Sequence, residues 1–300
     1  MADVKIEKIQ RIEELVEQLN IASKAYYNGQ DEIMSNYEWD AMFDELSVLE
    51  EETGYVLSNS PTQNVGYEST SGKKEQHEFA PLSLAKTKSV DELKKWADTY
   101  PIWLSWKLDG CTLVLTYDDG MLTKILTRGS GNMGTNITHL KNSIKGIPLE
   151  VPYKGHLVVR GEALISYSDF AVINDMIEDE DEKYANPRNL AAGTLNLDDA
   201  EEVKNRRVHF YAFTLVHMDE PMVSWGDRMN YLEEMKFTVV DRELGDGNTI
   251  ADMVDKWTKR VESGKMDLPV DGLVICYDDT EYASTGSVTG HHATRAGYAF

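Results

Sequence analysis

A change in the hydrophobic pattern near residue 60 divides this chain into a helical start and a strand-rich remainder. From residue 4 to about 28, apolar side chains recur every three or four residues, at Ile6, Ile9, Ile12, Val16, Leu19 and Ala22. This spacing is typical of one face of a helix. A second helix is predicted from Tyr37 to Glu52, with Ser35 or Asn36 as its N-cap and with Trp39, Met42, Phe43, Leu46 and Leu49 facing inward. The pattern therefore predicts a helical hairpin domain over residues 1–60.

Short runs with strand character follow, separated by turns and by helical segments. Strands are predicted in 102–108, 111–119, 121–129, 156–166, 208–216 and 271–279, and helices near 91–100, 168–178, 189–195, 227–236 and 249–263. Asp118-Asp119-Gly120 is typical of a hairpin turn. Residues 58–66 are interpreted as a linker and residues 69–76 as a loop rich in Gly, Ser and Lys. We expect an α+β domain with mostly antiparallel sheets over residues 61–300.

Composition argues against several classes of protein. The net charge of −22 disfavours an autonomous nucleic-acid binder, because such proteins gain affinity when Lys and Arg neutralise phosphates. No apolar run reaches the length of about 18 residues that a membrane span needs, and the N-terminus shows no apolar signal-peptide core. The cysteines Cys111 and Cys276 fit no metal-binding spacing. The expectation is a reduced, cytoplasmic protein.

Short motifs that carry chemistry occur in a fixed order within the strand-rich part. They are Lys107-Leu-Asp-Gly110, Thr127-Arg-Gly-Ser-Gly131, Arg160-Gly-Glu162, Asn186-Pro-Arg-Asn189 and Asp271-Gly-Leu-Val-Ile275. Each motif alone is weak, since Lys107 alone would be interpreted as an exposed turn lysine and the glycine-rich run as an ordinary turn. Their order and spacing together are specific.

In this order the motifs resemble those of the NAD-dependent DNA ligase family, and the stretches "SPTQNVG" and "PLSLAKTKSVDEL" before them support the resemblance. The resemblance covers nearly the whole chain. It implies a nucleotidyltransferase fold, the ATP-grasp-like adenylation fold of ligases, preceded by the small helical hairpin. An ATP-dependent DNA ligase or an RNA ligase is disfavoured because it would lack that hairpin.

The resemblance assigns the central chemistry to Lys107. In the family, a lysine amine attacks the AMP phosphorus of NAD and expels nicotinamide mononucleotide (NMN), and the complete enzyme passes AMP to a 5′-phosphate at a DNA nick. Because only the neutral amine attacks, Lys107 needs burial, neighbouring cations or a base. Asp109 and Gly110 are expected to form the turn that holds Lys107 beneath the phosphate, and Mg²⁺ is expected to screen the α-phosphate charge.

Further nucleotide contacts follow from the same resemblance. Arg128 matches an arginine that contacts ribose or phosphate. Glu162 matches a glutamate that accepts a hydrogen bond from a ribose hydroxyl, and its alternative is an ion pair with Arg160. Ser83 and Leu84 match a nucleotide-contacting pair, although Leu84 is equally compatible with a core position.

Two other regions are expected to bind the remaining parts of the substrates. Arg188 matches an arginine that grips DNA phosphate near the nick, and its alternative is to tether a loop. The hairpin matches the part of the family that closes over the NMN half of NAD, with Tyr26, Tyr27, Asn36, Trp39 and Asp40 at the matching positions. Aromatic rings stack on nicotinamide and attract its positive charge. The alternative is that Tyr26 and Trp39 only hold the hairpin together.

The sequence departs from the family pattern at several matched positions. In the helical hairpin, Tyr27 replaces a His of the family, Asn36 an Asp and Trp39 a Tyr. In the strand-rich part, Ser105 replaces a Glu, Asn196 an Arg and Cys276 a Lys. The change at Cys276 removes a cation that is expected near the α-phosphate. The alternative function is therefore a degenerate nucleotidyltransferase that serves as a nucleotide-binding or assembly subunit with little catalysis.

The final segment, "TRAGYAF", resembles the stretch before the last catalytic lysine of the family. The expected partner is nicked double-stranded DNA, bound through C-terminal domains missing from this chain or through a second subunit. No contact with a membrane is expected. An excised piece of a ligase and a ligase divided between two polypeptides, as in some phages, both fit. The expected location is the cytoplasm of a bacterial or phage-infected cell, with roles in DNA replication and repair.

Overall fold

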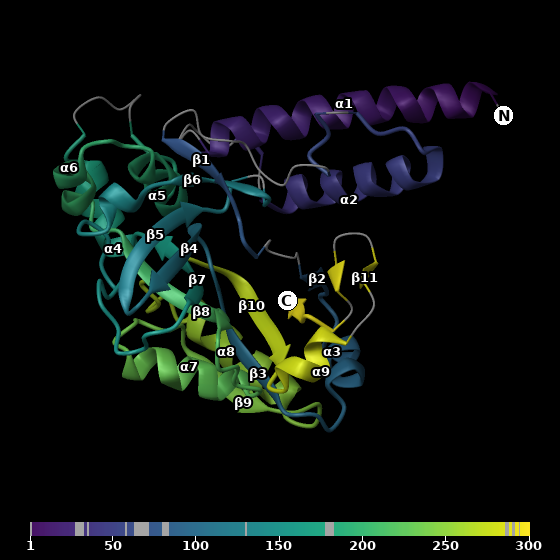
Figure 1. Ribbon diagram of the computed structural model, residues 1–300. Coiled ribbons are helices and arrows are strands. Elements are labelled where there is room, and N and C mark those ends of the chain that lie inside the picture. Colours follow the sequence, from purple (N-terminus) through teal and green to yellow (C-terminus); the bar gives the residue numbers. More distant parts are fainter. Residues whose placement is uncertain are drawn as a thin grey trace.

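The computed structural model describes residues 2–27, 33–34, 36–57, 59–62, 72–79, 84–129, 131–177, 183–285, 288–289, 292–293 and 295–300. Figure 1 shows a two-helix hairpin lying beside a larger body that is built from sheets and covering helices. In these ranges no helix combines the length and the apolar character needed to cross a lipid bilayer.

The N-terminal hairpin consists of α1 (Ala2–Tyr27) and α2 (Asn36–Thr53). Its core comprises Ile12, Leu15, Val16, Leu19 and Leu46, and Trp39, Met42, Phe43 and Leu49 pack against it. The predicted hairpin is thus confirmed, although Ile6 lies outside the core with 54% of its surface exposed. An ion pair of 2.8 Å between Arg11 and Glu45 joins the helices. α1 also contacts α5 (Pro187–Leu195), which places the hairpin against the larger body.

The first sheet has six strands in the order β1-β6-β5-β4-β7-β8, and its neighbours are antiparallel. The strands are β1 (Lys73–Gln76), β4 (Cys111–Asp118), β5 (Met121–Thr127), β6 (Met133–Asn136), β7 (Leu157–Leu164) and β8 (His209–Met218). Asp119 and Gly120 connect β4 to β5 with φ angles of 48° and 81°. Positive φ at both central residues is what a two-residue hairpin turn of type I′ requires, and Asp-Gly tolerates it. The predicted hairpin turn is confirmed.

The second sheet has five strands in the order β2-β13-β10-β3-β9. They are β2 (Ala85–Lys86), β3 (Ile102–Leu108), β9 (Arg242–Gly245), β10 (Val270–Tyr277) and β13 (Tyr298–Ala299). β2 and β13 are parallel, and the other neighbours are antiparallel. A separate pair consists of β11 (Val288–Thr289) and β12 (His292–Ala293).

Helices cover the sheets and enclose two cores. They are α3 (Val90–Ala97), the 3-10 helix η1 (Thr138–Leu140), α4 (Tyr167–Asp175), α5, α6 (Ala200–Asn205), α7 (Trp225–Glu234), α8 (Ile250–Glu262) and α9 (Thr280–Ser284). Leu104 and Trp106 of β3 and Ile275 of β10 pack on one side against residues of α3 and α8. Trp103 and Cys276, on the other side, pack against the core of the first sheet, to which α5 and α7 contribute. The second sheet therefore lies between α3 and α8 and the core of the first sheet.

The predicted α+β architecture with mostly antiparallel sheets is confirmed, but the loop expected over residues 69–76 is partly wrong. Residues 73–76 form the edge strand β1. Glu75 explains this, because its carboxylate accepts a hydrogen bond of 2.6 Å from the Asn136 amide and lies 2.7 Å from Lys124 Nζ. Polar side chains thus hold a strand that lacks the apolar alternation used to predict strands.

Charged and aromatic side chains hold the chain that follows β1 on the first sheet. The His156 ring bonds to Asp118 through Nδ1 at 2.6 Å and to Glu78 through Nε2 at 2.9 Å. Phe79 stacks on His217 with ring centroids 5.0 Å apart. The bond to Asp118 and then the bond to Glu78 raise the pKa of His156, although burial acts in the opposite direction. The charged ring therefore joins two carboxylates from distant parts of the chain.

The variant His156→Gln tests this contact. Because folding raises the pKa of His156, the protonated ring stabilises the folded chain. This stabilisation is complete below the unfolded-state pKa of about 6.5, and it is lost as the pH rises through the folded-state pKa. We expect the variant to lower the free energy of unfolding by about 0.5–1 kcal/mol near pH 6 and by much less near pH 9. Urea denaturation at both pH values measures this, and an equal loss at both would contradict it.

Candidate active site

The predicted nucleophile lies on the strand pair formed by β3 and β10. Lys107 is paired with Gly272, but the register shifts between Val270 and Gly272, so that Asp271 is the extra residue of a β-bulge. Bulges redirect side chains next to active sites. The Asp271 carboxylate forms an ion pair with Lys107 Nζ. The two side chains keep 37% and 34% of their surfaces exposed, so the pair is accessible to a ligand.

Gly272 makes this bulge possible. Its φ is 138°, a conformation that side-chain-bearing residues rarely adopt, and a Cβ at this position would lie 2.2 Å from the Phe300 carbonyl oxygen. The Asp-Gly pair of the last motif is thereby explained, since the glycine bends the backbone and the aspartate meets Lys107. The sequence motif locates this segment but does not predict the role of Asp271, because a motif does not reveal which strand pairs with it or in which register.

The Asp109-Gly110 turn connects β3 to β4 and is held from several sides. The Asp109 N–H donates to the Pro269 carbonyl at 3.0 Å, and its carboxylate lies 3.0 Å from Arg188 Nη1. A Cβ on Gly110 would lie 2.3 Å from the Ala163 carbonyl oxygen of β7, so only glycine fits. Burial lowers the pKa of Arg188 to about 10, although the Asp271 charge acts in the opposite direction. In this structure Arg188 tethers the turn, which was the alternative to its predicted contact with DNA.

Glu162 is a carboxylate buried on β7, with 8% of its surface exposed. Its Oε1 accepts a hydrogen bond from the Gly110 N–H at 3.2 Å, and its Oε2 accepts one from the Thr112 hydroxyl at 3.0 Å. Burial raises its pKa to about 7, while the Thr112 hydrogen bond and the charges of Lys107 and Arg128 oppose that rise. Glu162 is therefore tied to the nucleophile's turn and sits in the field of both cations.

The Nε atoms of Arg128 and Arg160 are buried without a hydrogen-bond partner within the described ranges. Arg160 Nη2 donates to the Phe79 carbonyl at 3.0 Å, so the alternative of an ion pair with Glu162 does not form. Burial and then repulsion by Arg128 lower the pKa of Arg160 to about 10. Guanidinium groups with unused donors are suited to an oxyanion such as phosphate. Arg160 is a second residue that motif reasoning leaves without a ligand role.

The predicted contacts of the hairpin are described only in part. Trp39 donates its indole N–H to Ser23 Oγ at 3.1 Å and stacks on Phe43 with ring centroids 5.0 Å apart. These contacts support the alternative in which Trp39 holds the hairpin together. Leu84 is partly buried just before β2. The side chains of Tyr26, Tyr27, Asn36 and Asp40, and all of Ser83, lie outside the described residues.

Cys276 and Ser105 lie on the same face of the second sheet as Lys107. The cross-strand partner of Cys276 is Trp103, four residues before Lys107, which corresponds to about 13 Å along the strand. Burial and then the Asp278 charge raise the pKa of the Cys276 thiol to about 12. Cys276 is therefore a neutral, partly buried side chain that packs against the core at a distance from the charged cluster around Lys107.

Mg²⁺ has no complete site among the described residues, which contain no group of three or more His, Cys, Asp or Glu side chains arranged for a metal ion. The carboxylates of Asp109 and Asp271 are instead paired with Arg188 and Lys107. Proteins commonly hold Mg²⁺ with one or two carboxylates together with substrate phosphates. These residues therefore fit Mg²⁺ only as the companion of a bound phosphate.

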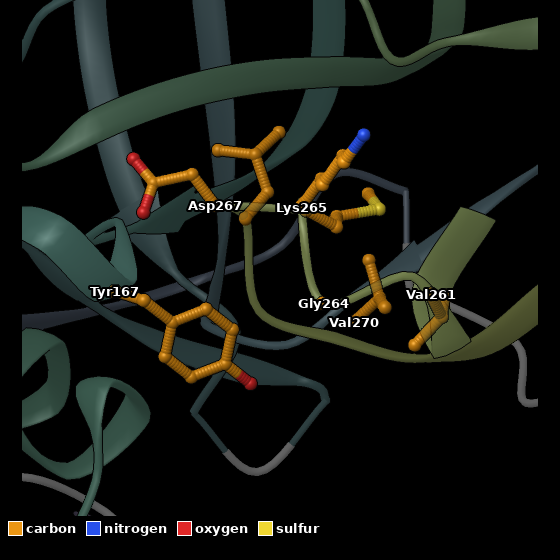
Figure 2. Close-up of a pocket in the computed structure, with 8 residues that line it drawn as sticks. Tyr167, Val261, Gly264, Lys265, Asp267 and Val270 are labelled. Atoms are coloured by element: carbon orange, nitrogen blue, oxygen red, sulfur yellow. The ribbon is translucent and has the colours of Figure 1, made fainter.

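A cavity of about 420 Å³ opens elsewhere, at the end of α8 (Figure 2). Its lining residues are Tyr167, Val261, Gly264, Lys265, Met266, Asp267, Leu268 and Val270. The Asp267 carboxylate accepts hydrogen bonds of 2.8 and 2.6 Å from the N–H and hydroxyl of Ser168, so it supports the start of α4. None of the residues gathered around Lys107 lines this cavity. We therefore place the candidate site at Lys107.

A partly exposed lysine amine that contacts a carboxylate is suited to act as a covalent nucleophile. Comparison with known families agrees with this role. Residues 69–296 match the family described as NAD-dependent DNA ligase adenylation domain, and residues 5–66 match the one described as DNA ligase-like, N-terminal NAD+-binding domain. The chain belongs to the NAD-dependent DNA ligase adenylation domain family. The resemblance and the nucleotidyltransferase fold predicted from the sequence are confirmed.

Curated bacterial relatives are similar over almost the whole chain. It is 44% identical over 281 residues to a DNA ligase of Lachnoclostridium phytofermentans and 44% identical over 282 residues to one of Ruminiclostridium cellulolyticum. Each alignment covers 93% of this chain and 43% of the relative, so the chain spans less than half of their length. Among solved structures, a mycobacterial DNA ligase D is 17% identical, with a TM-score of 0.39 over 74% of this chain and 61% of that chain.

The variant Glu162→Gln tests whether the buried charge of Glu162 lowers the free energy of unfolding. With a folded-state pKa of about 7 and an unfolded-state value of about 4.3, the folded chain binds the proton more tightly, so stability falls as the pH rises through this window. Glutamine keeps the shape without the charge. We expect its free energy of unfolding to exceed that of the wild type by about 1–3 kcal/mol at pH 8 and by much less at pH 5. Denaturation in urea at both pH values measures this, and a less stable variant at pH 8 would contradict it.

The variant Cys276→Lys tests the burial of position 276. The departure from the family suggests that a lysine at this position would help the chemistry. In this structure, however, the lysine side chain would lie beside Trp103 in a partly buried place packed against the core. We expect a loss of about 2–3 kcal/mol in the free energy of unfolding. Cys276→Met is the matched control, because it adds similar length without charge. Equal losses for the two variants would show that the charge is not the cause.

Proposed function

We propose that this chain catalyses the first step of NAD-dependent DNA ligation, the transfer of AMP from NAD to Lys107. The observation that carries the proposal is the partly exposed Lys107–Asp271 ion pair between β3 and β10. It brings the amine into contact with a carboxylate that can take its proton. Arg128 and Arg160, whose Nε atoms have no hydrogen-bond partner among the described residues, support a phosphate-bearing substrate close by.

The proposed step exchanges one bond to phosphorus for another. The lone pair of Lys107 Nζ forms a P–N bond to the AMP phosphorus, and the P–O bond to NMN breaks with its electron pair, so that NMN leaves as a phosphate monoester. The ammonium loses one proton before the attack and a second, which passes to solvent, as the bond forms. Asp271 is the carboxylate in contact with Nζ and accepts the first proton. Asp109 keeps the adjoining turn in place through Arg188.

The remaining substrate contacts are proposed from the family resemblance and the charges of the site. Glu162 accepts a hydrogen bond from the AMP ribose, and Arg128 binds ribose or phosphate with Ser83 and Leu84 nearby. Residues 61–300 bind the AMP half, and residues 1–60 bind the NMN half through Tyr26, Tyr27, Asn36, Trp39 and Asp40. The match of residues 5–66 to an NAD+-binding domain supports this division. Mg²⁺, held with the phosphate, supplies charge screening.

The partners of the complete enzyme are proposed on the same basis. AMP passes to the 5′-phosphate at a nick in double-stranded DNA, and relatives named DNA ligase support DNA as the substrate. The net charge of −22 means that other domains or a second subunit supply most of the grip on DNA. Arg188 would have to leave Asp109 before it contacted the DNA backbone. The proposed location is the cytoplasm of a bacterial or phage-infected cell.

Intact-mass measurement after incubation with NAD and Mg²⁺ tests the proposal. We expect one AMP on the wild type, mapped to Lys107, and no adduct with ATP in place of NAD. Lys107→Arg is the sharpest variant, because it keeps the cation beside Asp271 yet guanidinium does not act as the nucleophile. It should fold like the wild type and carry no AMP. AMP on another lysine with Lys107 unmodified would overturn the mechanism.

A further inference from the structure

A buried histidine outside the recognised motifs contacts the main chain of Arg128. His77 follows β1 and keeps 6% of its surface exposed. Its N–H donates to the Asn132 carbonyl at 2.8 Å, and its Nε2 lies 3.0 Å from the Arg128 carbonyl oxygen. The imidazole lies against the backbone of Gly134, where an added Cβ would come within 2.8 Å of Nε2. We call residues 128–134 the glycine-rich loop. His77 therefore contacts both its start, at Arg128, and its end, at Asn132 and Gly134.

The chemistry of this contact defines the state of the ring. A carbonyl oxygen only accepts hydrogen bonds, so Nε2 carries the proton and donates it to Arg128. Burial lowers the pKa of His77, the bond to the Arg128 carbonyl opposes this, and the charges of Arg160 and Arg128 lower it further. The ring is thus the neutral Nε2–H form, and its Nδ1 has no hydrogen-bond partner among the described residues.

The same carbonyl is also bound from within the loop. The Gly131 N–H donates to the Arg128 carbonyl at 3.1 Å, and the Arg128 N–H donates to the Thr112 carbonyl of β4 at 3.1 Å. Gly129 has a φ of 54°, and a Cβ there would lie 2.0 Å from the Met133 carbonyl oxygen. The main chain on both sides of the Arg128 Cα is thereby held, and this determines where its guanidinium group can reach.

We propose that His77 is a positioning residue for the nucleotide site, which holds the Arg128 main chain through its Nε2–H so that the guanidinium group meets the ribose or phosphate of the bound nucleotide. This inference rests on the proposed function. His77 does not touch the reacting atoms, and it acts only through Arg128.

A matched pair of variants isolates the donating atom. The side-chain amide nitrogen of His77→Gln reaches roughly where Nε2 stands, whereas that of His77→Asn ends roughly where Nδ1 stands. Both variants remove the ring and keep an amide donor. If the Nε2–H bond matters, Gln replaces it and Asn does not.

Two readouts are measured on the full chain. Hydrogen exchange of the Gly131 amide, which shares the Arg128 carbonyl with His77, should quicken about fivefold to tenfold in His77→Asn and stay near the wild-type rate in His77→Gln. Single-turnover adenylation from NAD should show the same order of variants. In His77→Asn the NAD concentration at half-saturation should rise, while the maximal rate changes less. Gln near wild type with Asn impaired supports the proposal. Two unaffected variants, two equally impaired variants, or the reverse order each overturn it.

The exchange readout keeps this test separate from that of the proposed function. If the wild type takes up no AMP from NAD, the proposed function fails, and the adenylation arm is replaced by AMP binding followed by calorimetry. Exchange at Gly131 then still decides whether His77 holds the loop. Affinity for AMP that does not differ between His77→Asn and the wild type, despite faster exchange, would overturn the positioning role.

Discussion

The cross-strand register between β3 and β10 is the constraint on which the candidate site depends. Lys107 stands opposite Gly272 only because the strand gains one residue at Asp271, and that extra residue carries the carboxylate. A regular ladder would place the aspartate in a paired position, with its side chain directed by the pleat. The positive φ of Gly272 allows the irregularity. The contact between acid and amine is therefore a property of backbone pairing.

Burial of charge is the second feature that organises the site, and it opposes stability. Glu162 and Arg160 are removed from water, and burial is the leading cause of the pKa change of each. Neither is compensated by a direct ion pair with the other. These buried charges lower the free energy of unfolding, and the burial of the hydrophobic cores offsets that loss. A ligand with phosphate and ribose hydroxyl groups would supply the missing partners.

Much of the fold and the centre of the site follow from the sequence, and the omissions have a physical cause. The prediction for 102–108 coincides with β3, because its residues alternate between core and site faces. The order of the motifs locates Lys107 and Glu162. The roles of Asp271 and His77 escape, because their partners are set by register between strands far apart in the chain. β2 and β13, with two residues each, are too short to show any periodicity.

The partial burial of Arg128 and Arg160 has a consequence for the response to ionic strength. Salt screens exposed charges over about 10 Å at 0.1 M, but it acts weakly on charges enclosed by protein. The acidic exterior of this chain, with a net charge of −22, repels an approaching anion, whereas Arg128 and Arg160 attract it only at close range. Added salt should therefore speed the encounter with a phosphate-bearing ligand while leaving its departure nearly unchanged, the reverse of the salt effect on ligands steered by a basic surface.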